Sequence, residues 1–152
     1  MRRKKTKRQI TRSTKVKYKG IEFASKLEMH MYKLLCQEKI KVDYEGTTFT
    51  LVPGFKFESS TYEKTKARKE LHDKGNKKIL PITYTPDFVD AHDPPRFIIE
   101  TKGNPNEAFP IRWKLFKKHL HDTNNTATLF MPRNQKDCAE VVRLIKDTIL
   151  SA

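Results

Sequence analysis

Apolar residues recur at helical spacing in three parts of this 152-residue chain. Leu27, Met31, Leu34 and Leu35 fall at positions i, i+4, i+7 and i+8, which predicts a helix over residues 25–39 with one buried stripe. The same spacing predicts two further helices, from Glu107 or Pro110 to His121 with the apolar face Trp113, Phe116 and Leu120, and over residues 137–150 with the apolar face Cys138, Val141, Val142, Ile145 and Ile149.

Short runs of β-branched and aromatic residues predict strands between these helices. The run that ends in Val89 and the run Phe97-Ile98-Ile99 are separated by the turn residues Asp93-Pro94-Pro95, which predicts two neighbouring strands. Alternating polarity over residues 40–51, with a turn at Gly46, predicts an antiparallel hairpin. Residues 20–23 are predicted to form a short strand or an extended lead-in, and a further strand is predicted at residues 126–131. This order of elements indicates an α/β fold with a mixed sheet flanked by helices.

Residues 55–79 interrupt this pattern as a basic insertion with little apolar content. Within it, residues 61–72 have the composition of a helix, and the run Asp73-Lys74-Gly75-Asn76 ends it. We expect an exposed helix that either lies along DNA or is simply solvated.

The length suits one domain, over residues 20–152, preceded by a basic tail over residues 1–19 that is disordered when free or contacts DNA. No run of about 18 apolar residues predicts a membrane span, and no apolar segment follows the basic N-terminus to form a secretory signal. Cys36 and Cys138 each lie in an apolar helical pattern, which is typical of core thiols in a reducing cytoplasm.

The net charge of +14 comes from two segments. Residues 1–19 contain ten Lys or Arg and no acid, residues 56–78 contain eight basic and four acidic residues, and the rest is neutral. Such segments indicate contacts to the nucleic-acid backbone, although a solubilising tail would have the same composition. The residues predicted to contact DNA are Arg2, Arg3, Lys4, Lys5, Lys7, Arg8, Arg12, Lys66, Arg68, Lys69, Arg112 and Lys114.

The candidate chemistry lies at the ends of the two neighbouring strands. Asp87 follows Pro86, and Glu100 follows the apolar run that ends at Ile99. Glu100 and Lys102 point to one face of the strand, because side chains alternate, and Thr101 points to the other. Two carboxylates on neighbouring strands form a site for a hard divalent cation such as Mg²⁺.

Glu28 has two interpretations from the sequence. Ser25 is a good helix N-cap, and Glu28 three residues later completes a capping box that needs no further function. Alternatively, Glu28 lies at the margin of the buried stripe and supplies a third carboxylate to the metal site.

These motifs carry a family resemblance. Pro86-Asp87, a gap of twelve residues and Glu100-x-Lys102, with Ile98-Ile99 before and Gly103 after, resemble the PD-(D/E)XK nuclease superfamily. The blocks Ser25-Lys26-Leu27-Glu28, Tyr84-Thr85-Pro86-Asp87-Phe88 and Glu100-Thr101-Lys102-Gly103 are similar to its phage endonuclease I branch, and the likeness covers residues 18–120.

The resemblance implies a restriction-endonuclease-like fold and Mg²⁺-dependent hydrolysis of DNA phosphodiester bonds, with Mn²⁺ as a substitute. It implies Asp87 and Glu100 as ligands, the carbonyl of Thr101 as a further one, and Glu28 as a ligand or support. Lys102 would orient the attacking water or stabilise the phosphate.

The endonuclease I branch contains Holliday-junction resolvases, so the resemblance implies four-way or other branched DNA, a role in recombination, a homodimer with two active sites, and a phage-encoded protein in the host cytoplasm. The chain departs from that pattern by its insertion at residues 55–79 and by its N-terminal rather than C-terminal basic tail.

Two alternatives stay open. The chain could cut ordinary duplex DNA or DNA ends in a restriction- or recombination-linked role. It could also be a non-catalytic basic nucleic-acid-binding protein, which explains the charge but gives no reason for Asp87, Glu100 and Lys102.

Overall fold

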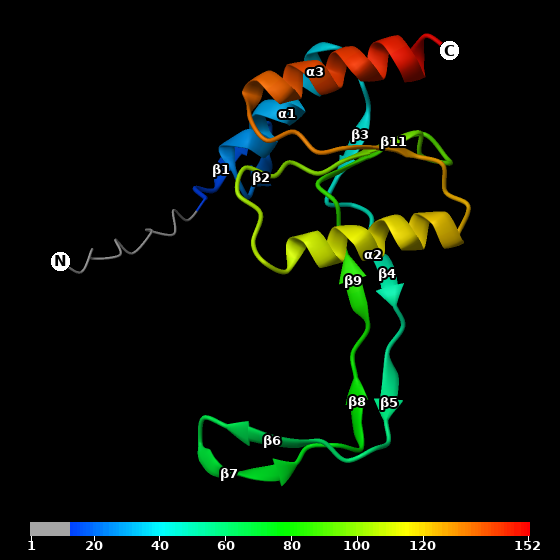
Figure 1. The fold of residues 1–152 in the computed structure, drawn as a ribbon. Coiled ribbons are helices and arrows are strands. Elements are labelled where there is room, and N and C mark those ends of the chain that lie inside the picture. The colour runs from blue at the N-terminus through cyan, green and yellow to red at the C-terminus, as the bar shows by residue number, and fades with distance from the viewer. Residues whose placement is uncertain (1–12) are drawn as a thin grey trace, which may run out of the picture.

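The centre of the protein is a four-stranded mixed sheet (Figure 1) in a computed structural model that describes residues 13–152, apart from the side chain of Arg68. Its strands are β3 (Val42–Tyr44), β10 (Phe88–Asp90), β11 (Phe97–Ile99) and β12 (Thr128–Phe130). The spatial order is β12-β11-β10-β3. β10 pairs antiparallel with β3 and β11, whereas β12 runs parallel to β11.

Helices cover both faces of this sheet. They are α1 (Lys26–Gln37), α2 (Phe109–Asp122) and α3 (Gln135–Ile145), the last continuing as a π-helical turn (Lys146–Leu150). Phe88, Phe97 and Ile99 share a core with α1 and α3, while Val89 and Ile98 share the other core with α2. Alternate residues of β10 and β11 thus face opposite helical layers. The predicted α/β fold, with a mixed central sheet flanked by helices, is confirmed.

Local signals set the helix ends. The Ser25 hydroxyl accepts the Glu28 N–H at 3.2 Å at the start of α1, and the Asn134 side chain accepts the Asp137 N–H at 2.9 Å at the start of α3. Pro110 lies in the first turn of α2, where a missing N–H costs nothing. The three predicted helices are confirmed, with ends shifted by a few residues.

The end of the basic tail is part of the folded body. β1 (Val16–Tyr18) and β2 (Ile21–Phe23) form an antiparallel hairpin, in which Phe23 is fully buried and Val16 and Tyr18 pack on the same core. The strand at residues 21–23 is confirmed. The expectation of a disordered tail up to residue 19 was wrong for residues 16–18, because these apolar side chains can be buried.

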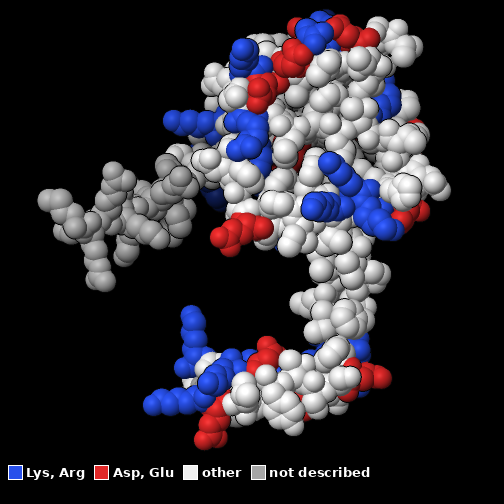
Figure 2. Space-filling view, viewed as in Figure 1, with Lys and Arg blue, Asp and Glu red and all other residues white. Residues whose placement is uncertain are grey.

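A two-stranded ribbon leaves the body beside α2 and turns sideways at its end (Figure 1). From the body outwards its pairs are β4 (Phe49–Val52) with β9 (Ile82–Tyr84), β5 (Phe55–Phe57) with β8 (Lys77–Ile79), and β6 (Tyr62–Thr65) with β7 (Arg68–Asp73). We call residues 53–81 the arm and residues 58–76 its tip. An open gap separates the tip from the body in Figure 2.

The helix predicted at residues 61–72 was wrong, because these residues form β6 and β7. Helix propensities differ by only tenths of a kcal/mol per residue, and a short helix without an apolar stripe gains no tertiary packing. The antiparallel pairing instead satisfies the backbone groups of both strands. The predicted exposure of the insertion is confirmed, since Tyr62 is 65% and Leu71 59% exposed.

The hairpin predicted over residues 40–51 was also wrong. β3 pairs with β10, whereas β4 pairs with β9 in the ribbon. Glu45 has a φ of +47°, and its N–H donates to the carbonyl of Asp87 at 2.9 Å. This turn takes the chain out of the sheet after β3 instead of folding it back on itself.

Candidate active site

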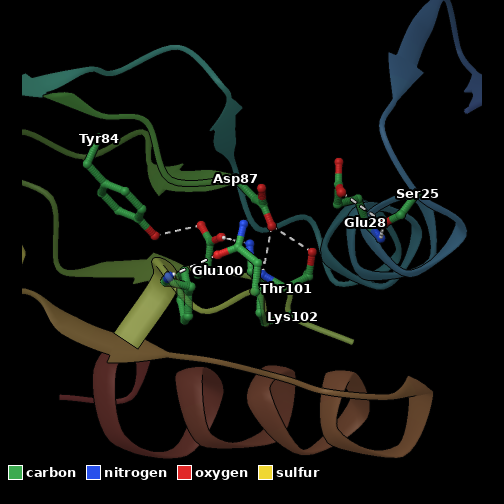
Figure 3. A network of polar contacts seen from close by, with 9 residues as sticks. Ser25, Glu28, Tyr84, Asp87, Glu100, Thr101 and Lys102 are labelled. Carbon is green, nitrogen blue, oxygen red and sulfur yellow. Dashed lines mark hydrogen bonds and ion pairs between the residues drawn. The ribbon is translucent and has the colours of Figure 1, made fainter. Parts of the chain in front are cut away.

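β10 and β11 bring two carboxylates together at one edge of the sheet. Phe88 and Ile99 are direct partners, so Asp87, just before β10, lies opposite Glu100, just after β11. Oδ2 of Asp87 accepts the Thr101 N–H at 2.7 Å and the Thr101 hydroxyl at 2.6 Å (Figure 3). The expectation that neighbouring strands deliver these two acids is confirmed, and Thr101 fixes the orientation of one of them.

Glu100 is only 5% exposed and has two side-chain partners. Its carboxylate accepts the Tyr84 hydroxyl at 2.6 Å and the Lys102 Nζ at 3.3 Å. Lys102 Nζ also lies 4.5 Å from the centre of the Phe109 ring, at the start of α2. Glu100 and Lys102 therefore share one face of the strand, as predicted.

Glu28 approaches from the first turn of α1 and is 7% exposed. Its carboxylate accepts hydrogen bonds from the Ser25 hydroxyl at 2.8 Å, the Tyr44 hydroxyl at 2.6 Å and the Ala24 N–H at 3.1 Å. The predicted N-cap contact of Ser25 is confirmed, but the Glu28 carboxylate accepts the Ala24 N–H rather than the Ser25 N–H that a capping box would use. The same geometry brings Glu28 to Asp87. In Figure 3, Asp87 lies between Glu28 and Glu100.

Glu45 is the site residue that the sequence analysis missed. One carboxylate oxygen from each of Glu28, Glu45 and Asp87 lies within 4.8 Å of the other two. Glu100 is not part of this trio, because its carboxylate turns towards Tyr84 and Lys102. An acid directly after a strand and before Gly46 was the available signal, since Asp87 and Glu100 also lie at strand ends.

The donor set fits a hard divalent cation. Its groups are all carboxylate oxygens, the ligand type that Mg²⁺ prefers. Neither Oδ1 of Asp87 nor the Glu45 carboxylate accepts a hydrogen bond from any residue in the described part of the chain, so both remain available as ligands. The carbonyl of Thr101 stays a predicted ligand.

Without a cation, burial and mutual repulsion disfavour the ionised form of the neighbouring carboxylates. Burial, followed by the neighbouring Glu100 and Glu28 carboxylates, raises the pKa of Asp87 from 3.8 to about 8, against the lowering effect of the Thr101 hydrogen bonds. Burial and Glu100 raise the pKa of Tyr84, and burial and Glu28 raise that of Tyr44. Both phenols therefore remain protonated donors at neutral pH and hold the two glutamates in place.

This charge predicts how stability depends on pH. Because the pKa of Asp87 is raised to about 8, the metal-free folded state binds more protons than the unfolded state from about pH 4 to about pH 8. The contribution of Asp87 to the free energy of unfolding is fully present below pH 4. It is lost as the pH rises through about 8, at up to about 1.4 kcal/mol per pH unit. Mg²⁺ should restore the stability, most strongly at the high end of this range.

Thermal unfolding at pH 5 to 8, with Mg²⁺ and with EDTA, measures this effect. Asp87→Asn is the matched control, because its amide has the same shape and does not titrate. We expect the variant to lose both the fall in Tm with pH and the Mg²⁺ response. Parallel Tm curves for wild type and variant would exclude Asp87 as the source.

A pocket of about 350 Å³ opens beside Glu100. Lys102 and Arg112 line it with residues of β9 and the start of α2, whose N-terminal dipole favours an anion. Arg112 therefore adds positive charge to the pocket. Lys114 is exposed on α2 and is not among the lining residues.

Three other predicted DNA contacts lie away from this pocket. Lys66 lies in the turn between β6 and β7, and Arg68 and Lys69 belong to β7 at the tip of the arm. The remaining seven, which are Arg2, Arg3, Lys4, Lys5, Lys7, Arg8 and Arg12, lie outside the described residues.

Fold and site together define an α/β protein with acidic side chains gathered at one edge of a mixed sheet. The chain belongs to the family described as "Protein of unknown function (DUF1064)", which matches residues 8–134 and so includes the whole site and the arm. Neither the curated proteins nor the solved structures contain a match to it. Over residues 13–152, no helix is both long and apolar enough to cross a membrane.

Proposed function

We propose that this protein is a Mg²⁺-dependent endonuclease that hydrolyses DNA phosphodiester bonds, with a restriction-endonuclease-like fold and a PD-(D/E)XK site. The observation that supports this most is the meeting of Asp87, Glu100 and Lys102 at the ends of two adjacent strands, with Glu100 and Lys102 lining an open pocket. A basic binding protein needs no buried Glu100 held by Tyr84 and Lys102. An active site explains this arrangement.

Each residue has a role in this proposal. Asp87, Glu28 and Glu45 would hold the cation. Glu100 lies on the other side of Asp87 (Figure 3) and lines the pocket together with Lys102. When bound, Mg²⁺ polarises the scissile phosphate and lowers the pKa of the attacking water. Lys102 orients that water or stabilises the charge that develops on the phosphate. The water oxygen attacks phosphorus, the bond to the 3′ oxygen breaks, and that oxygen takes up a proton, leaving a 5′-phosphate and a 3′-hydroxyl.

We further propose branched DNA, above all the four-way junction, as the substrate, and a homodimer that makes two symmetric nicks. This part rests on the endonuclease I resemblance, and duplex DNA is the second candidate. A cytoplasmic location belongs to the same proposal and is supported by two unpaired thiols, Cys36 and Cys138.

Cleavage of a labelled four-way junction and of a linear duplex with the same arm sequences tests these proposals. Each substrate is incubated with Mg²⁺, with Mn²⁺ and with EDTA. We expect paired nicks in the junction with either metal and none with EDTA. Equal cutting of both substrates would retain the nuclease and reject the junction, and no metal-dependent cutting of either would favour the binding protein.

A further inference from the structure

The stalk of the arm, which we define as residues 53–57 and 77–81, has two opposed lysines on one face. In the pairing of β5 with β8, Lys56 lies directly opposite Lys78, and Phe55 lies opposite Ile79. Residues opposite each other in a pair point to the same face, so the two lysines share one face. Phe55 and Ile79 lie on the other face, together with Phe57 and its partner Lys77. Like charges placed directly opposite destabilise a strand pair, unless an anion lies against them.

The tip continues the basic surface. Lys64, Lys66 and Lys69 are exposed there, and Figure 2 shows Lys and Arg side chains projecting from the tip, including towards the gap below the body. Glu58, Glu63, Glu70 and Asp73 offset part of this charge, but the arm as a whole carries eight basic and four acidic residues. Asp73 also holds the corner of the tip, because its Oδ1 accepts the backbone N–H groups of Thr61 at 2.9 Å and Gly75 at 2.7 Å. The surface is thus suited to a polyanion.

The sideways turn of the tip is built by specific contacts. Lys74 N–H donates to the Thr61 carbonyl at 2.7 Å, and Asn76 N–H donates to the Ser59 carbonyl at 3.2 Å. A Cβ atom at Gly75 would lie 2.0 Å from the Ser59 carbonyl oxygen, so only glycine fits. The corner therefore fixes the direction of the tip.

The arm is joined directly to the candidate active site. β9 leads from the stalk into Thr83, Tyr84 and Thr85, which line the pocket beside Glu100. The gap in Figure 2 has the tip on one side and the body on the other. A ligand bound in the pocket would therefore contact the strand that leads into the arm.

We propose that the arm is a clamp for double-stranded DNA, which lies in the gap and contacts phosphates through Lys56 and Lys78 of the stalk and Lys64, Lys66 and Lys69 of the tip. The ligand is a duplex, because its two closely spaced phosphate backbones form the dense polyanion to which exposed lysines bind by releasing counterions. This inference rests on the proposed function for the identity of the ligand. In this proposal the arm binds the substrate at a distance from the bond that is cleaved.

Binding of the full chain to a fluorescent duplex, by anisotropy in EDTA over a series of NaCl concentrations, tests the clamp without cleavage. The tip variant carries Lys64→Gln, Lys66→Gln and Lys69→Gln. The control variant carries Lys39→Gln, Lys41→Gln and Lys136→Gln, three exposed lysines outside the arm. We expect the tip variant to bind about tenfold or more weaker at moderate salt, with a slope of log K against log salt that is shallower by about 2 to 3, and the control to change much less.

Gly75→Val tests the geometry of the clamp, because it keeps every charge and displaces the corner. We expect weaker duplex binding with an unchanged far-ultraviolet dichroism spectrum for the helices. Equal losses in the tip and control variants, or no loss in the tip variant, would overturn the clamp. A loss of binding that accompanies loss of self-association in sedimentation would also overturn it, because the arm would then join two copies through the face that carries Phe55 and Ile79.

These experiments distinguish failure of the clamp from failure of the proposed nuclease function. If wild type never cleaves DNA but the tip variant loses binding selectively, the clamp stands and the nuclease fails. If wild type cleaves with Mg²⁺ and the tip variant binds normally, the nuclease stands and the clamp fails.

Discussion

Glu100→Gln is expected to lower the rate of Mg²⁺-dependent DNA cleavage by at least about a thousandfold. Glutamine keeps the size of the side chain and one oxygen that accepts the Tyr84 hydroxyl, so packing around the buried site changes little. It removes the negative charge that faces Asp87 and holds Lys102 at 3.3 Å. The loss should therefore fall on kcat, with DNA affinity in EDTA unchanged.

Single-turnover cleavage of the preferred substrate measures this effect. Glu140→Gln, on the exposed side of α3, is the matched control and should cleave like wild type. A Glu100→Gln protein that folds normally and retains more than about a tenth of the activity would remove Glu100 from the chemistry. The trio Glu28, Glu45 and Asp87 would then be the whole candidate centre.

Lys102→Met is expected to lower kcat by about a hundredfold to a thousandfold, the typical cost of removing one group that stabilises developing charge. Methionine keeps much of the apolar stem that lies beside the Phe109 ring but has no ammonium group. The cation site should persist, because Lys102 contributes no ligand. The rise in Tm on adding Mg²⁺ should therefore remain close to that of wild type.

Cleavage rate and Mg²⁺-induced Tm shift are measured together on Lys102→Met, with Lys136→Met as the control on exposed α3. A variant that loses both would show that Lys102 acts through the structure of the site. A variant that keeps both would show that the pocket lysine is dispensable. If Lys102→Met loses only activity, while Asp87→Asn loses the Mg²⁺ response, Lys102 acts in the transition state and Asp87 acts as a metal ligand.

The contrast between Glu28 and Glu45 explains how far the site could be predicted. Ser25 and Glu28 form a recognisable helix start, so the sequence offered a local reason to examine Glu28. Glu45 had no such motif, and the pairing of β3 with β10 and the hydrogen bond of its N–H to the Asp87 carbonyl bring it to the site. That contact joins residues 42 positions apart, and no periodicity within either segment indicates it.

The arm was beyond prediction for a related reason. Residues 61–72 contain good helix formers, and their composition favours a helix by small increments. The decisive contacts lie between strands and at the corner of Gly75 with the Ser59 carbonyl, where the backbone leaves no room for a side chain. Such contacts depend on which segments meet, and composition does not specify that.

The sequence by itself determined the three helices, the strands on either side of residues 93–95, and the joint position of Asp87, Glu100 and Lys102. These features depend on spacing within one segment, because apolar periodicity and the alternation of side chains along a strand are local properties. Only the tertiary structure decided the partners of β3 and β4, the ribbon form of the arm and the place of Glu45 beside Asp87. Those depend on backbone hydrogen bonds between distant segments, whose free energies are settled when the whole chain packs.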